Sequence, residues 1–374
     1  MLPSKPRGVL LFVEDPGAAN FVAGLPDVLR RRGLSPHLVT AGVATGYLQQ
    51  RHVKVDCLPP QCDLEALVSR FAPRLIVVGT AENPDSYGLR LVAIAAARHI
   101  PSIGVIDSST HLDFRFRGHT ANPLEFCPNT VIVPDALCRT GFVKLGLPED
   151  RIVVAGHPHW DYVRATHRAI QQGDRGELRR RIFNLPSPTL PVILFAAEVS
   201  GGMSPGQFQL SGDYSLRGTG TSRGRTEIVI EEFLRAAAPR RRELHLVLRL
   251  HPKHGPQALS AYAGEFDGIS RAEPALEAVY AADAVVGMTS MMLVEATLMG
   301  RPTLAIVPRA REAEWLPTIA AGVTPCASTR GALETQLSRL LRPPWPAPQN
   351  ELERLFPSGA LERAAAHCAA LLAR

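Results

Sequence analysis

The 374-residue sequence lacks long apolar runs and paired cysteines. None of its apolar runs approaches the roughly 20 residues that a membrane-spanning helix needs. The cysteines include no Cys-x-x-Cys pair, so we expect neither a zinc site nor a disulfide framework. These six residues, which we interpret as mostly buried small hydrophobic side chains, are Cys57, Cys62, Cys127, Cys138, Cys326 and Cys368.

The beginning of the chain also lacks the apolar segment of a signal peptide. The first apolar run, Val9–Val13, is too short for that role and continues directly into Glu14 and Asp15. We therefore expect a cytoplasmic protein. The turn that follows this run reads Glu-Asp-Pro-Gly-Ala-Ala-Asn, which is not the Gly-x-Gly-x-x-Gly fingerprint of dinucleotide-binding proteins.

Positive charge exceeds negative charge, and the formal net charge is +6. Much of the excess lies in three arginine clusters, at residues 30–32, 179–181 and 240–242, each near the end of an expected helix. We interpret these clusters as solvated helix ends. The alternative is weak attraction to anionic lipid or polyanionic glycan, which would place the protein peripherally at the inner face of a membrane. No aromatic residues are interleaved with the arginines, which argues against nucleic-acid binding.

The length favours two domains of roughly 150 to 200 residues each. Hydrophobic residues make up 45% of the chain, enough for full cores. Short apolar runs alternate with helical patterns in both halves, which predicts an α/β protein with parallel sheets. We expect helices at residues 21–32, 63–71, 226–238 and 351–374, among others.

The most informative stretch is a predicted strand, turn and helix near the end of the second half. The apolar run Ala284–Gly287 stops at a glycine, and a helix is predicted over Met291–Met299. Thr289 and Ser290 stand where the helix N-cap should be, so unpaired amides and the positive end of the helix dipole would meet there. The sequence therefore predicts an anion site at this turn.

A second predicted strand, at residues 244–250, ends in three potentially cationic side chains. Arg249, His251 and Lys253 follow one another within five residues, and Pro252 closes the strand. Ligands of open parallel sheets sit outside the carboxyl ends of the strands. We therefore expect these side chains and the capped helix to share one crevice suited to a nucleotide phosphate.

These two motifs resemble the nucleotide-binding half of GT-B glycosyltransferases. The Arg-Leu-His-Pro-Lys element at 249–253 is similar to that of bacterial sialyltransferases, capsule Kdo transferases and CDP-glycerol glycerophosphotransferases. The Thr-Ser, Glu-Ala and Gly-Arg-Pro element at 289–302 resembles that of many sugar-nucleotide enzymes, including the non-hydrolysing UDP-GlcNAc 2-epimerases. The resemblance implies two Rossmann-like domains with parallel sheets facing a central cleft. It also implies a nucleotide sugar as co-substrate, with no further cofactor.

The resemblance also suggests domain boundaries. We expect an N-terminal, acceptor-binding domain at residues 1–165, a linker at 166–190 and a nucleotide-sugar-binding domain at 191–348. Residues 349–374 would form a C-terminal helix that packs back on the N-terminal domain, as in other GT-B chains. Gly156-His157-Pro158 resembles the segment at which many such chains cross into the second domain. No metal signature surrounds His157 and His159.

The expected donor site combines both motifs with residues from two other segments. Glu295 is expected to accept hydrogen bonds from ribose hydroxyls. The Gly- and Ser-rich stretch 199–225 is either a lid or disordered. Its arginines, Arg225 among them, could close over phosphates. The residues expected to bind the donor are Glu198, Arg225, Arg249, His251, Lys253, Thr289, Ser290 and Glu295.

The catalytic base is expected from the first domain. Asp15 and Glu14 lie on the first strand-to-helix turn, and we favour Asp15; Glu82 and Asp107 compete with it. The alternative for Asp15 is an ordinary N-cap before Pro16. His251 completes the expected catalytic set. The acceptor would be bound by Asn20, Glu82, Asp107 and His111.

The sequence is compatible with three functions. The first is a metal-independent, inverting glycosyltransferase that acts on a glycan or other hydroxyl acceptor, for example in bacterial surface polysaccharide or glycoconjugate synthesis. The second is a sugar-nucleotide epimerase of the UDP-GlcNAc 2-epimerase type. This sequence lacks the Gly-Thr-Arg-Pro-Glu type turn and the Ser-Gly-His-Arg-Arg-Glu-Asn type segment of that family. The third is a non-catalytic nucleotide-binding accessory protein.

Overall fold

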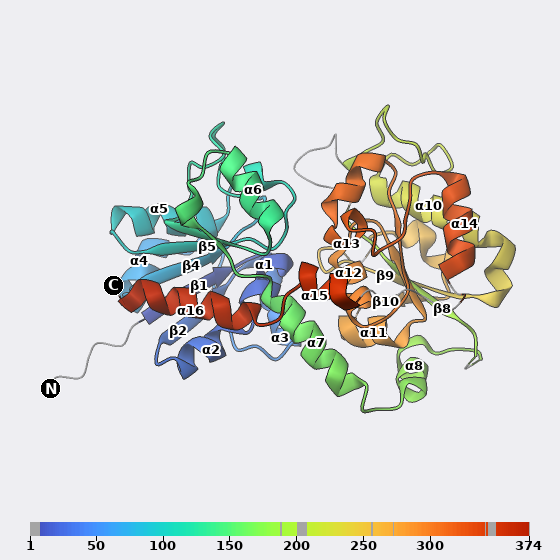
Figure 1. The fold of residues 1–374 in the computed structure, drawn as a ribbon, viewed down its shortest axis with the longest axis horizontal. Coiled ribbons are helices and arrows are strands. Elements are labelled where there is room, and N and C mark those ends of the chain that lie inside the picture. Colours follow the sequence, from blue (N-terminus) through green and yellow to red (C-terminus); the bar gives the residue numbers. More distant parts are fainter. Residues whose placement is uncertain are drawn as a thin grey trace. The chain divides into compact units, whose positions relative to one another are not determined.

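The computed structural model describes residues 8–187, 189–199, 208–255, 257–271, 273–340, 342 and 349–373 (Figure 1). The chain divides into two compact units. Unit 1 consists of Met1–Asp161 and Phe356–Arg374, and unit 2 of Tyr162–Leu355. Among the described residues, no helix is both long and apolar enough to span a bilayer.

Unit 1 is built on a seven-stranded sheet in the order β3-β2-β1-β4-β5-β6-β7, in which all neighbours are parallel. The sheet consists of β1 (Gly8–Val13), β2 (Ser35–Thr40), β3 (Asp56–Cys57), β4 (Leu75–Gly79), β5 (Ser102–Val105), β6 (Thr130–Val133) and β7 (Ile152–Val154). Its helices are α1 (Pro16–Val22), α2 (Leu25–Arg31), α3 (Gly42–Gln50), α4 (Leu64–Phe71), α5 (Tyr87–Ala97), α6 (Ala136–Lys144) and α16 (Ala360–Ala373). Helix α7 (Pro158–Ile170) carries the chain across the boundary between the units.

Strand β1 shows why this sheet is covered on both faces. Val9, Leu11 and Val13 point into one core, which includes residues of α1, α2 and α16. Leu10 and Phe12 point into the opposite core with residues of α4 and α5. Successive strand residues face opposite sides, so an entirely apolar strand requires helices on both.

Unit 2 repeats the plan with a six-stranded parallel sheet in the order β10-β9-β8-β11-β12-β13. The sheet consists of β8 (Val192–Ala196), β9 (His245–Arg249), β10 (Gly268–Ser270), β11 (Ala284–Gly287), β12 (Thr303–Ile306) and β13 (Cys326–Ala327). Its helices are α8 (Arg175–Phe183), α10 (Arg225–Ala237), α11 (Ala275–Ala281), α12 (Met291–Leu298), α13 (Pro317–Ala320), α14 (Arg330–Leu340) and α15 (Gln349–Leu355). Phe195 of β8 packs against Phe233 of α10 with ring centroids 5.1 Å apart.

Two helices that the sequence predicts as continuous are each divided. The helix expected over residues 21–32 is α1 followed by α2, because Pro26 lacks an N–H and fits the start of a helix better than its interior. The helix expected over 351–374 is α15 followed by α16, with Pro357 and Gly359 between them. Gly359 has a φ of +81°, which ends helical geometry there.

Gly79 lets α1 approach the end of β4 closely. A methyl group at Gly79 would lie 2.5 Å from Cβ of Ala18 and 2.8 Å from Cγ1 of Val13. Replacing Gly79 with Ala is therefore expected to lower the free energy of unfolding by about 1–3 kcal/mol, as measured by urea denaturation. Gly46 on α3 is the control, because a methyl group there meets nothing within 4 Å. Gly46→Ala should leave stability unchanged or raise it by up to about 1 kcal/mol; equal effects at both positions would contradict the packing argument.

Candidate functional site

Each sheet has one point where the strand order reverses. In unit 1 the chain builds outward from β1 on one side and from β4 on the other, and in unit 2 from β8 and β11. Ligands of such sheets bind outside the carboxyl ends of the strands at this point. Each unit therefore has its own candidate edge: the carboxyl ends of β1, β4 and β5 in unit 1 and those of β8, β9 and β11 in unit 2.

A carboxylate occupies the turn where the sequence predicts an anion. The Thr289 amide, immediately before α12, donates a hydrogen bond of 2.6 Å to Oε1 of Glu198. The Thr289 hydroxyl donates to Oε2 of the same side chain at 3.2 Å. Glu198 follows β8, so this contact joins the ends of β8 and β11. The anion at Thr289 is thus a side chain of the protein itself.

Arg225 neutralises Glu198 from inside unit 2. Its guanidinium lies 2.7 Å from Glu198 and 2.6 Å from Glu312, and the residue is 1% exposed. Arg309 pairs with Glu312 from the other side. Arg225 and Arg309 both lie over the ring of Trp315. These charges form one cluster of two arginines and two glutamates, in which Arg225, Arg309 and Glu312 are buried and Glu198 is partly exposed.

The position of Arg225 differs from the one expected. It is the first residue of α10 and is buried in this cluster, whereas the sequence suggested a loop arginine able to close over phosphates. Residues 200–207 of that stretch lie outside the described part of the chain. The following part is held by α10: the amides of Gly218 and Thr219 donate to Glu232 and Glu231 at 2.9 and 2.6 Å.

Hydrogen bonds fix the orientation of the His251 ring. The Lys253 amide donates to Nδ1 of His251 at 3.1 Å, so the neutral ring carries its proton on Nε2. The His251 amide donates to Nδ1 of His254 at 3.1 Å. The pKa of His254 is lowered, chiefly by burial; the hydrogen bond between His254 and the backbone of Glu198 acts in the opposite direction. His254, which the sequence analysis did not single out, thus links the ends of β9 and β8.

The other cations beyond β9 do not all face the same way. Arg249 is 9% exposed and points toward β10, where its guanidinium donates to Oγ of Ser270 at 2.7 Å and lies 3.3 Å from Glu273. Lys253 is exposed. Arg249 therefore braces the β9–β10 edge through these contacts, and its expected contact with a donor phosphate stays a prediction.

Helix α12 begins at the hydroxyl cap that the sequence predicts. Oγ of Ser290 accepts a hydrogen bond from the Met292 amide at 3.2 Å. Glu295 lies on the buried face of this helix and is 7% exposed. Its expected hydrogen bonds to ribose hydroxyls stay a prediction.

The carboxyl edge of unit 1 carries two close pairs, one of a histidine with a carboxylate and one of an arginine with a carboxylate. Nδ1 of His111 lies 2.8 Å from Oε1 of Glu82, and Arg115 lies 3.1 Å from Asp107. Burial raises the pKa of Asp107; Arg115 lowers it, and the neighbouring Asp15 and Glu82 raise it further. Three carboxylates from three strand ends therefore gather around one arginine and one histidine. Arg115, whose contact with Asp107 the sequence analysis missed, lies eight residues beyond it.

Three residues expected at this edge have structural partners. Oδ1 of Asp15 accepts from the Gly17 amide at 3.2 Å and caps α1, which is the alternative that the sequence left open. Oε2 of Glu14 accepts from the Tyr87 amide at 3.4 Å. Oδ1 of Asn20 accepts from the Tyr47 hydroxyl at 2.8 Å and from Arg51 on α3. Asn20 therefore ties α1 to α3, a role other than the expected acceptor contact.

No family model and no curated protein matches the chain. Solved structures do resemble it over nearly its whole length. The UDP-GlcNAc 2-epimerase of Neisseria meningitidis, solved with UDP-GlcNAc, is 13% identical to this chain and has a TM-score of 0.67. The match covers 98% of this chain and 100% of the epimerase chain. HepE of Anabaena, solved with UDP-glucose, has a TM-score of 0.60 and 12% identity, with coverages of 97% and 99%. The kitacinnamycin glycotransferase has a TM-score of 0.59 and 16% identity, with coverages of 99% and 100%.

These likenesses concern the fold. Epimerases and glycosyltransferases appear among the same neighbours, at identities too low to distinguish their chemistries. The two-domain α/β fold with parallel sheets, predicted from the sequence as GT-B, is confirmed.

Proposed function

We propose that this protein is a metal-independent, inverting glycosyltransferase that moves a sugar from a nucleotide-activated donor to a hydroxyl acceptor. One observation supports this most strongly. Hydrogen bonds run from His251 through His254 and Glu198 to Thr289 and bind the ends of β9, β8 and β11 into one edge. Groups fixed in this way can meet a donor phosphate without rearranging.

The donor would be held by unit 2. Nε2–H of His251 donates a hydrogen bond to a phosphate oxygen, and the exposed Lys253 supplies positive charge nearby. Negative charge grows on the departing nucleotide as the bond between the sugar carbon and the phosphate oxygen breaks. Donors that are already oriented toward that oxygen stabilise the transition state more than the ground state.

The acceptor would be activated by unit 1, and the His111–Glu82 pair is now our first candidate for the base. Glu82 holds Nδ1 of His111 at 2.8 Å, so Nε2, which is buried in this structure, is the nitrogen left to take the acceptor's hydroxyl proton once the acceptor has reached it. The Glu82 carboxylate then stabilises the imidazolium. The acceptor oxygen forms its bond to the sugar carbon on the face opposite the departing phosphate, which inverts the configuration. Asp15 is the second candidate, because its Oδ1 already serves as a helix cap.

Epimerisation is the alternative chemistry. It is favoured by the number of epimerases among the structural neighbours, whereas both epimerase sequence segments noted above are absent. Incubating the protein with UDP-GlcNAc alone distinguishes the two. A manno-configured product formed without an acceptor would replace the transferase proposal.

The nucleotide can be identified by thermal denaturation with CMP, CDP, UDP, GDP and dTDP. A ligand that binds only the folded state stabilises it by RT ln(1 + [L]/Kd), or about 2.7 kcal/mol at a hundredfold excess over Kd. Because two neighbours are solved with UDP-sugars, UDP comes first. Failure of all five nucleotides to raise the melting temperature would contradict the proposal. The acceptor, proposed to be a glycan of a surface polysaccharide or glycoconjugate, would then be sought by mass spectrometry.

Replacing His251 with Ala is expected to weaken binding of the active nucleotide by about tenfold or more, because a hydrogen bond to a charged phosphate is lost. Isothermal titration calorimetry measures the change. His119→Ala is the control, since His119 is 70% exposed and pairs only with Asp85 among the described residues. Equal affinities for the two variants would remove His251 from the donor site.

A further inference from the structure

A pocket of about 450 Å³ opens at the amino edge of the unit 2 sheet. Tyr280 of α11 lies just before β11, and Gly300 and Arg301 lie between α12 and β12. The pocket thus lies at the opposite end of α12 from Ser290. Its volume is within the range of about 300–1,000 Å³ typical of small-ligand sites.

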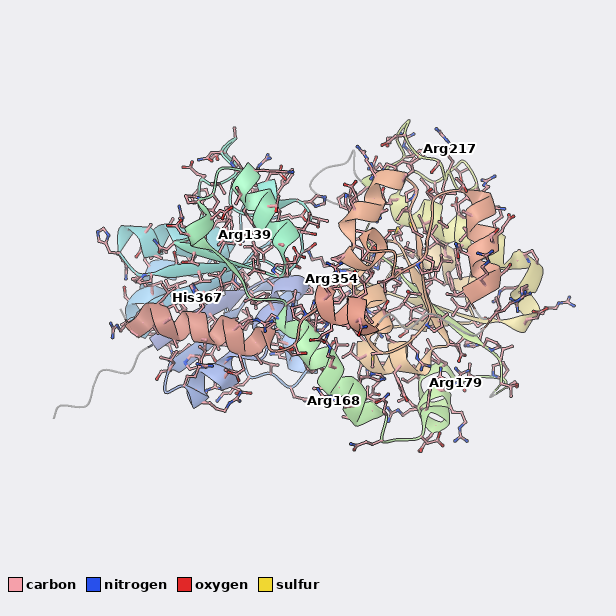
Figure 2. All side chains as sticks on the ribbon, in the orientation of Figure 1. Arg139, Arg168, Arg179, Arg217, Arg354 and His367 are labelled. Carbon is pink, nitrogen blue, oxygen red and sulfur yellow. The ribbon has the colours of Figure 1, made fainter. Side chains whose placement is uncertain are left out.

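Helix α7 supplies one wall of this pocket through a single face. Arg164, His167, Arg168 and Gln171 recur at the spacing that aligns side chains on a helix. Arg164 lies 3.2 Å from Glu353 of α15, which is also in the wall. Arg168, which Figure 2 shows on α7, is exposed and has no ion pair within the described residues.

Arg301 and His167, which line this pocket, each have a nitrogen atom that makes no hydrogen bond to the described residues. Nε of Arg301 and Nε2 of His167 are buried and have no hydrogen-bond partner among the described residues. Burial, and after it the charge of Arg175, lowers the pKa of Arg301. Buried polar atoms without partners are rare and costly, and a bound ion or molecule is a common reason for them.

Tyr280 accounts for part of this arrangement. The Arg301 guanidinium lies 5.4 Å from the centre of the Tyr280 ring, and the His167 ring lies 5.5 Å from it. A cation–π contact stabilises the face of the guanidinium, but Nε–H lies in the guanidinium plane and still needs an acceptor. Packing against Tyr280 therefore does not supply the acceptor that the Nε–H group of Arg301 needs.

The charges at this pocket determine the class of ligand. Glu353 is paired to Arg164, whereas the guanidinium groups of Arg168 and Arg301 have no ion pair among the residues that the structure describes. The carboxyl end of α12 opposes an anion, so the attraction must come from these side chains. We infer that this pocket binds a phosphate monoester, or an equivalent small dianion, between Arg301, Arg168 and His167. This site is separate from the proposed donor site and adds to the proposed function.

The first test is isothermal titration calorimetry of the whole protein with inorganic phosphate. Arg301→Gln is expected to weaken binding by about tenfold or more and Arg168→Gln by a smaller factor. Arg339→Gln, an exposed arginine on α14, is the matched control and should bind phosphate as the unchanged protein does. Arg301→Lys keeps the charge and should recover part of the affinity, which a loss caused by misfolding would not.

His251→Ala separates this site from the donor site. Phosphate affinity should survive this change if the pocket is the binding site, whatever the outcome of the nucleotide experiments. Failure of phosphate to bind would overturn the inference, as would binding that is lost in His251→Ala or unaffected by Arg301→Gln and Arg168→Gln.

A second arm identifies the source of the phosphate. Vesicles of phosphatidylcholine with or without phosphatidic acid are incubated with the protein and sedimented. Binding that needs phosphatidic acid and is displaced by inorganic phosphate indicates a lipid headgroup. Phosphate binding in solution without sedimentation indicates a soluble phosphate ester. Sedimentation that Arg301→Gln and Arg168→Gln leave unchanged would contradict a role for the pocket at membranes.

Discussion

Replacing Arg225 with Met is expected to lower the free energy of unfolding by about 3–5 kcal/mol. Arg225 is the only described group that bridges Glu198 and Glu312, and Glu312 is 0% exposed. Without the guanidinium, Glu198 loses its ion pair, and Glu312 keeps its ion pair with Arg309. Removing one partner from a buried ion network leaves an uncompensated charge in a medium of low dielectric constant, which is why the loss is large.

Equilibrium urea denaturation followed by circular dichroism measures this change. Arg217→Met is the control, because Arg217 is exposed on the connection before α10, as Figure 2 shows, and its loss should change stability by no more than about 0.5 kcal/mol. A second variant, Arg225→Met with Glu312→Gln, removes one of the stranded charges and should recover part of the loss. Similar stabilities for Arg225→Met and Arg217→Met would show that the cluster is not energetically important.

Replacing His111 with Gln is expected to lower kcat of sugar transfer by a factor of about 10²–10⁴, the usual contribution of a general base. Glutamine can still hydrogen-bond Glu82 but cannot take the acceptor's proton. Donor affinity should be unchanged, since the donor groups belong to unit 2. Steady-state kinetics with the donor identified by the nucleotide screen measures both quantities.

His119→Gln is the matched control for this prediction. His119 also pairs with a carboxylate at 2.8 Å, that of Asp85, but both side chains are at least 70% exposed. Its replacement should leave kcat unchanged. If His111→Gln retained full turnover while Asp15→Asn lost it, the base would be Asp15 and not the His111–Glu82 pair.

The features that the sequence predicts well are local. Ala284–Gly287 and Met291–Met299 are read correctly as strand and helix, because an apolar run, a glycine and a hydroxyl N-cap follow one another within a few residues. The strand at 191–197 is found for the same reason. Since parallel strands end at a common edge, these local readings also place Glu198, His251 and Ser290 near one another.

The features that the sequence does not predict depend on distant partners. Arg225 and Glu312 are 87 residues apart, so no local pattern could show that the arginine is buried rather than available to phosphate. The contact between Glu198 and Thr289 spans 91 residues. The shared contact of Asn20 with Tyr47 and Arg51 likewise depends on α3, a helix that the sequence analysis did not predict.

Unit 1 consists of two separate segments of the chain, which affects the order in which the two units can fold during synthesis. Ala364, Ala365, Cys368 and Leu372 of α16 belong to the same core as Val9 and Leu11 of β1. Unit 2 lies between these segments and is continuous in sequence. During synthesis on the ribosome, all residues of unit 2 are therefore present before α16, which contributes to the core of unit 1, has been translated.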